Sequence, residues 1–131
     1  MPQRLEHITP AAMEALLDDR AIPVAHRALW ALLRDEVALS DCLALDVQDI
    51  DLHRRTAHVS APTKGDDSVT VPLGARAVSL LRDAIGNRTD GQALRISRSE
   101  AVRQARDLGH SIHAFRAALP PGRSAPEPQS R

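Results

Sequence analysis

The sequence has no tyrosine, one tryptophan, one phenylalanine and one cysteine among its 131 residues. The absence of tyrosine excludes any mechanism in which a tyrosine of this chain acts as nucleophile or acid. The few aromatic residues argue against a base-stacking platform for single-stranded nucleic acid, which needs several exposed rings. The single cysteine, Cys42, excludes an internal disulfide and a cysteine-based zinc site. We expect Cys42 to be buried as a small apolar residue.

The sequence also lacks an apolar run long enough to span a membrane and the N-terminal apolar stretch of a signal peptide. We therefore predict a cytoplasmic protein without membrane contacts. The length is that of one domain, and 43% apolar with 26% charged residues is ordinary for a globular protein. The histidines show no metal-ligand spacing, so we expect neither a metal site nor a cofactor.

The net charge is zero, but it is unevenly distributed along the chain. Residues 1–50 hold 4 basic and 9 acidic side chains, whereas residues 74–116 hold 8 arginines and 4 acidic side chains. The basic half is compatible with a nucleic-acid partner. Solvated arginines on helix faces explain the same charge distribution equally well.

Helical spacing of apolar residues, together with capping residues, predicts most of the secondary structure. Helices are expected after Thr9, over residues 24–36, from Ser40, over residues 74–85, from Ser97 or Ser99 to residue 108, and over residues 111–119. Alternation predicts strands at residues 56–59 and 68–73 around a turn, and residues 93–96 are a candidate third strand. The fold class is therefore α+β, mostly helical, with a small antiparallel hairpin or three-stranded sheet. We assign residues 1–119 to the domain and residues 120–131 to a Pro- and Ser-rich disordered tail.

Three segments, in this order and spacing, resemble the catalytic domain of tyrosine recombinases, the phage-integrase family. Residues 36–45, EVALSDCLAL, with DID at 49–51, resemble the family's G-L-R-x-S-E-L-x-x-L and D-I-D. The expected hairpin carries the only lysine, Lys64, in its turn and is followed by V-P-L, as in the family. Residues 113–116, HAFR, resemble the family's H-x-L-R.

The resemblance implies a DNA-related role but an incomplete catalytic set. Members of the family cut and rejoin DNA through a covalent phosphotyrosine, with arginines, a lysine and histidines around the reacting phosphate. Lys64, His113 and Arg116 fall on family positions, whereas Ala38 stands where the first arginine belongs. With no tyrosine present, the resemblance implies a truncated, degenerate relative that is not an enzyme and has no catalytic residues.

We therefore predict a non-catalytic DNA-binding or recombination-accessory protein whose partner is duplex DNA. The remnant phosphate site would consist of Lys64, His113 and Arg116. Additional DNA contacts are expected from four further arginines: Arg54, Arg55, Arg103 and Arg106. Two alternatives stay open, namely a protein-interaction module that keeps the fold without binding DNA, and a decayed integrase fragment. A full-length recombinase or a second copy of the chain would then be the partner.

Overall fold

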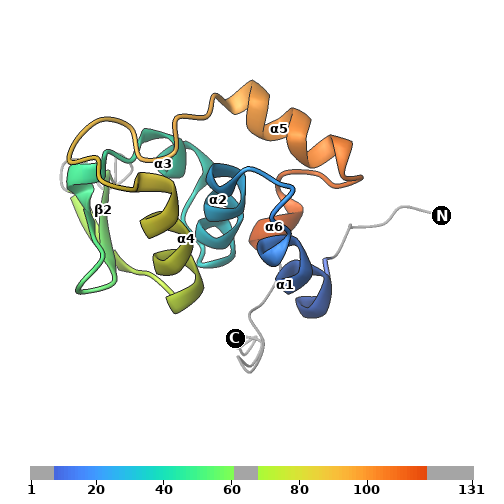
Figure 1. Cartoon of the computed structure of the whole chain (residues 1–131), viewed down its shortest axis with the longest axis horizontal. Coiled ribbons are helices and arrows are strands. Elements are labelled where there is room, and N and C mark those ends of the chain that lie inside the picture. The colour runs from blue at the N-terminus through green and yellow to red at the C-terminus, as the bar shows by residue number, and fades with distance from the viewer. Residues whose placement is uncertain (1–7, 61–67, 118–131) are drawn as a thin grey trace, which may run out of the picture.

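The computed structural model describes residues 8–60 and 68–117, and over these residues six α-helices pack together with a small sheet at one edge (Figure 1). The elements are α1 (Pro10–Asp18), α2 (Val24–Arg34), α3 (Leu39–Ala44), a 3-10 turn η1 (Val47–Asp49), β1 (Ile50–Asp51), β2 (Thr56–Ser60), β3 (Ser68–Pro72), α4 (Ala75–Ile85), α5 (Arg98–Asp107) and α6 (Ala114–Ala117). The mostly helical α+β class predicted from the sequence is confirmed. Among the described helices, none has the length and apolar character that crossing a bilayer requires.

Capping residues explain where several helices begin and end. The Thr9 hydroxyl accepts a hydrogen bond from the Ala12 amide at 3.1 Å, and Pro10 occupies the first position of α1. Ser97 and Glu100 form a reciprocal capping box at the start of α5. Gly86, at a φ of 61°, ends α4 in a conformation that favours glycine.

Helix α2 lies at the centre of the fold. Every residue from position 28 to position 34 is buried, so this half of the helix has no face turned to solvent. Helices α1, α3, α4 and α6 all contact it, and Figure 1 shows α2 in the middle of the helical layer. Cys42 of α3 is fully buried in the same core, as expected from the sequence.

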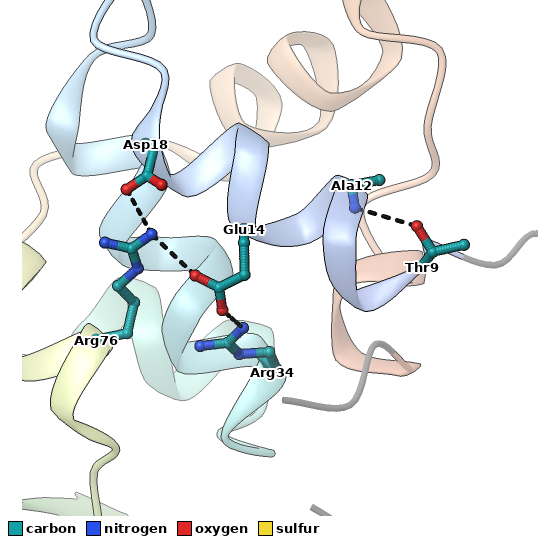
Figure 2. Close-up of polar contacts among 6 residues, drawn as sticks. All are labelled: Thr9, Ala12, Glu14, Asp18, Arg34 and Arg76. Atoms are coloured by element: carbon teal, nitrogen blue, oxygen red, sulfur yellow. Dashed lines mark hydrogen bonds and ion pairs between the residues drawn. The ribbon is translucent and has the colours of Figure 1, made fainter. Parts of the chain in front are cut away.

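The last residue of α2, Arg34, places a charged group in this core. Its side chain is 5% exposed, and its Nη1 donates to Oε2 of Glu14 on α1 at 2.6 Å. The second oxygen of Glu14 accepts from Arg76 of α4 at 2.9 Å, and Arg76 also contacts Asp18 (Figure 2). Partial burial would by itself raise the pKa of Glu14, but the hydrogen bond and charge of Arg34, with those of Arg76, hold it below its ordinary value.

An aromatic stack attaches α6 to α2. The rings of Trp30 and Phe115 are parallel within 1°, with centroids 4.6 Å apart, and both residues are fully buried. The ring of His110 meets Phe115 edge-on at 5.9 Å. Ile112 and Ala114, close to Phe115 in the sequence, are also buried. Because α6 is one turn long, the stack and these residues hold the end of the described chain in place.

The sheet has the strand order β1-β2-β3, with antiparallel pairing throughout. Residues 93–96, the candidate third strand, do not join it. Ala93 instead donates to the Leu45 carbonyl at 2.9 Å, beside an isolated bridge between Asp46 and Gln92. Arg95, at a φ of 58°, interrupts an extended conformation there. The third strand is β1, directly before the hairpin.

A contact across the fold caps α4. No side chain adjacent to α4 caps its first turn; instead Oδ2 of Asp35, just after α2, accepts from the Gly74 amide at 2.7 Å. A Cβ at position 74 would lie 3.2 Å from both carboxylate oxygens of Asp35. A side chain at position 74 would therefore displace this carboxylate by a few tenths of an ångström, because the carboxylate approaches the backbone closely.

We predict that Glu14→Gln lowers the free energy of unfolding by about 1–3 kcal/mol at pH 7, since it weakens a hydrogen bond to a buried guanidinium. A carboxyl with a lowered pKa stabilises the fold above its ordinary pKa of 4.5 and loses this effect as the pH falls through the folded-state pKa. The difference between wild type and variant should therefore shrink in acid. Urea denaturation between pH 7 and pH 3 measures it. Asp19→Asn is the control, because Asp19 contacts the Ala21 amide rather than an arginine.

We predict that Phe115→Ala lowers the free energy of unfolding by about 3–5 kcal/mol, through lost stacking and the cavity left beside Trp30. Phe115→Leu, which keeps most of the apolar volume, should lose about 1.5 kcal/mol or less. Trp30 is the only tryptophan, so its fluorescence during urea denaturation reports on this contact directly. A loss below about 1 kcal/mol in Phe115→Ala would show that the stack does not hold α6.

Candidate nucleic-acid interface

The three residues of the expected remnant phosphate site are described to different extents. Lys64 lies outside the described residues. Arg116 belongs to α6, but its side chain is likewise outside what the structure describes. His113 is described and exposed. The convergence of the three side chains on one phosphate therefore stays a prediction.

His113 lies in the turn that leads into α6, not on a helix starting at Ser111 as expected from the sequence. The Ser111 hydroxyl accepts the His113 amide at 3.2 Å, and the Ser111 carbonyl accepts the Ala114 amide at 3.0 Å. These bonds make a turn and delay the start of the helix to Ala114. Because Ile112 and Ala114 on either side are buried, the side chain of His113 is directed outward.

Ala38 occupies the position at which the sequence resemblance expects the first arginine. It is the N-cap residue of α3 and is partly exposed, and its carbonyl accepts the Cys42 amide at 2.9 Å. The backbone here is a regular helix start, yet the methyl side chain offers no hydrogen-bond donor to a phosphate.

Arg103 and Arg106 lie on the exposed side of α5. They are three residues apart and so share a helix face, opposite the fully buried Ala101 and Ala105. Hydrogen bonds from the Ser97 backbone and side chain lower the pKa of Glu100, the acid one turn before them. The charges of His26 and Arg103 lower this pKa further, so Arg103 has an acidic neighbour on α5.

Arg54 and Arg55 lie in the bend of residues 52–55 that joins β1 to β2. Both are exposed, and Arg54 forms an ion pair with Asp51 at 3.8 Å. The sheet and α5 lie at opposite sides of the molecule in Figure 1. The structure therefore does not bring the four additional arginines together, and separates them into one pair in the bend and one pair on α5.

The structure also shows a basic cleft that sequence reasoning missed. A cleft of about 230 Å³ brings Arg55 of the bend together with Arg82 of α4. The sequence signal for Arg82 is only its helical spacing from Ala75 and Ser79, and nothing in the sequence relates that face to the bend. Among the residues with described positions, no three His, Cys, Asp or Glu side chains are grouped so that they could hold a metal ion.

Comparisons with known proteins agree with this architecture. A search of curated protein sequences found no match. Among solved structures, a crystal structure of XerA recombinase superimposes with a TM-score of 0.66 at 20% sequence identity, over 88% of this chain and 49% of that one. The chain thus spans about half the length of that recombinase and shares its fold over that part. The model of the phage integrase family matches residues 6–118, which is most of this chain. The chain therefore belongs to the phage integrase family.

Proposed function

We propose that the chain is a non-catalytic, duplex-DNA-binding protein derived from a tyrosine recombinase. The observation that carries this proposal is the division of its arginines into two groups. Four arginines donate hydrogen bonds to acceptors within the fold: Arg27, Arg34, Arg76 and Arg88. Five others between positions 82 and 106 are exposed, and none of their side chains has a hydrogen bond or ion pair with another described residue: Arg82, Arg95, Arg98, Arg103 and Arg106.

The second group is what a DNA-binding surface requires. Arginines that the fold does not use remain free to neutralise phosphates, and phosphate contacts supply most of the affinity of duplex binding. Arg103 and Arg106, on one face of α5, suit such contacts best because they project from the same exposed helix side. The proposed remnant site at Lys64, His113 and Arg116 would add a second group of phosphate contacts.

The acidic N-terminal half opposes DNA less than its sequence suggests. Glu14 and Asp18 both contact Arg76, which comes from the basic half of the chain. The two halves therefore partly compensate each other's charge in space, and repulsion of an approaching duplex is reduced near α1.

The non-catalytic part of the proposal rests on two missing groups. Ala38 replaces an arginine that would stabilise charge on the reacting phosphate, and loss of one such group typically reduces the rate about 10²–10³-fold. The 131 residues also contain no tyrosine, so they supply no nucleophile for a phosphotyrosine intermediate.

The competing interpretation as a protein-interaction module expects an exposed apolar patch on the helices. Across residues 8–60 and 68–117, the most exposed large hydrophobic residue is Val69 of β3, at 40%. The large hydrophobic residues of the described helices are buried or packed, partly buried, against the core, which gives this interpretation no observation in its favour.

We predict that affinity for duplex DNA falls steeply with salt, with a log–log slope of about −0.9 per neutralised phosphate. Lys64→Ala and Arg116→Ala should each flatten the slope by about one unit, and the double variant Arg103→Gln/Arg106→Gln by about two. Arg20→Gln, which removes an exposed arginine of the acidic half, is the matched control and should leave the slope unchanged. Fluorescence anisotropy with a labelled duplex measures these slopes. Absence of duplex binding at low salt would refute the proposal.

We predict that no covalent protein–DNA adduct forms on a nicked suicide duplex, even at high protein concentration. Ala38→Arg should form none either, because restoring charge stabilisation does not provide a nucleophile. Denaturing gel electrophoresis of the reaction measures this, with an active tyrosine recombinase as the positive control. An adduct that survives denaturation would show that the chain is catalytic.

A further inference from the structure

A small cleft lies between the β1–β2 bend and α4, at the end of the hairpin where β2 begins. Its volume is about 230 Å³. Residues from both elements line it: Leu52, His53 and Arg55 from the bend, and Ala75, Val78, Ser79 and Arg82 from α4. The α4 residues recur at a spacing of three and four, so one helix face forms a wall of the cleft.

The polar groups around this cleft are those that bind oxyanions. Its lining residues include two arginines, a histidine and a serine, and none of them is acidic. Arg55 and Arg82 are exposed, and neither side chain is hydrogen-bonded or ion-paired to another residue of the described ranges. Guanidinium groups bind phosphate oxygens in a fork geometry that suits two-point contacts.

Another arginine-lined cleft among the described residues differs in this respect. It has a volume of about 340 Å³ and lies beside Arg34 and Arg76. Both of these arginines are already bonded to carboxylates, since Glu14 contacts both and Asp18 contacts Arg76. An anion there would have to displace these carboxylates, whereas the cleft beside Arg55 and Arg82 has unoccupied donors.

The backbone of Arg55 fixes the shape of the bend. Its φ of 59° lies in the left-handed region, where glycine and asparagine are favoured and arginine is disfavoured. The carbonyl of Arg55 accepts the Leu73 amide at 2.8 Å, and its guanidinium takes no part in this bond. Glycine would satisfy the turn with less strain, so the guanidinium at position 55 can be removed by substitution without loss of the bend.

We propose that the cleft formed by His53, Arg55, Ser79 and Arg82 binds a phosphate group. The site goes beyond the proposed remnant site, because Arg55 precedes β2 whereas Lys64 comes after it, and the five residues of β2 span about 16 Å. The phosphate belongs either to the backbone of a duplex or to a free phosphate ligand. The recognition chemistry is the same for both.

The test is a titration of inorganic phosphate into ¹⁵N-labelled protein, at constant ionic strength and followed by two-dimensional NMR. We expect saturable shifts centred on the amides of residues 53, 55, 79 and 82. Arg55→Gly and Arg82→Gln should each weaken phosphate binding about tenfold, the equivalent of one charge-assisted hydrogen bond. Arg55→Gly should also be at least as stable as wild type in urea, because it relieves the left-handed strain.

Arg20→Gln is the matched control. Arg20 is also exposed but does not line the cleft. Its replacement removes the same charge and should leave phosphate affinity unchanged. Shifts that do not saturate, that centre on other residues, or that are the same in wild type and Arg55→Gly would overturn the proposal.

A second titration, with duplex DNA, identifies the source of the phosphate. If the cleft holds a backbone phosphate, the same amides shift with DNA, free phosphate competes, and Arg55→Gly flattens the salt slope by about one unit. If the ligand is a free phosphate, its binding persists with duplex present and the slope is unaffected. Because the phosphate titration uses no DNA, its result still tests the phosphate site if the proposed DNA-binding function fails.

Discussion

The burial of residues 28–34 of α2 on all sides is the constraint on which the rest of the structure depends. A helical segment with no solvent face must be covered completely, and α1, α3, α4 and α6 all contact this helix. The same burial draws Arg34 into the interior and so requires Glu14 of α1 as its partner. It also requires a flat aromatic contact for the short α6. The surface side chains are then those on the faces of the covering helices that do not pack against α2.

Sequence reasoning predicted the features that depend on local signals. The caps at Thr9 and Ser97 and the stop at Gly86 are encoded within one or two turns of the helices they bound. The third strand was less predictable, because β1 and residues 93–96 both have a plausible extended pattern. Burial of Leu94 and the left-handed Arg95 decided between them. Such a decision depends on tertiary packing, which periodicity alone does not contain.

The candidate site could be predicted only where it follows from adjacent residues. The outward direction of His113 follows from its buried neighbours, although the sequence predicts helix from residue 111 where the structure has a turn before α6. Exposure of Arg103 and Arg106 follows from the buried alanines of α5. The pairing of Arg55 with Arg82 could not be predicted, because it depends on how α4 docks beside the bend.

The arginines of this chain have two different roles, in the fold and at the surface, and the amino-acid composition does not distinguish them. Arg88 donates to the carbonyls of Ala84, Gln92 and Ala93. These hydrogen bonds stabilise the loop between α4 and α5, which has no regular secondary structure. Arg27 donates in the same way to the carbonyls of Leu17 and Ile22, and so ties α2 to the end of α1 and the connection between them. In both cases the guanidinium satisfies backbone acceptors in the last turn of a helix and in the segment that follows it. Such residues belong to the scaffold, and only the arginines left over can serve a ligand.

The contact between Asp35 and Gly74 has a consequence for the order of folding. The two residues are 39 positions apart, so the cap of α4 cannot form while that helix is isolated. The first turn of α4 gains its acceptor only when it docks against the end of α2, which makes helix formation and docking one cooperative event. In a nascent chain, the first turn of α4 would therefore stay frayed until α4 has been synthesised and has docked against the end of α2. The centre of the domain should then form in a single late step and not helix by helix.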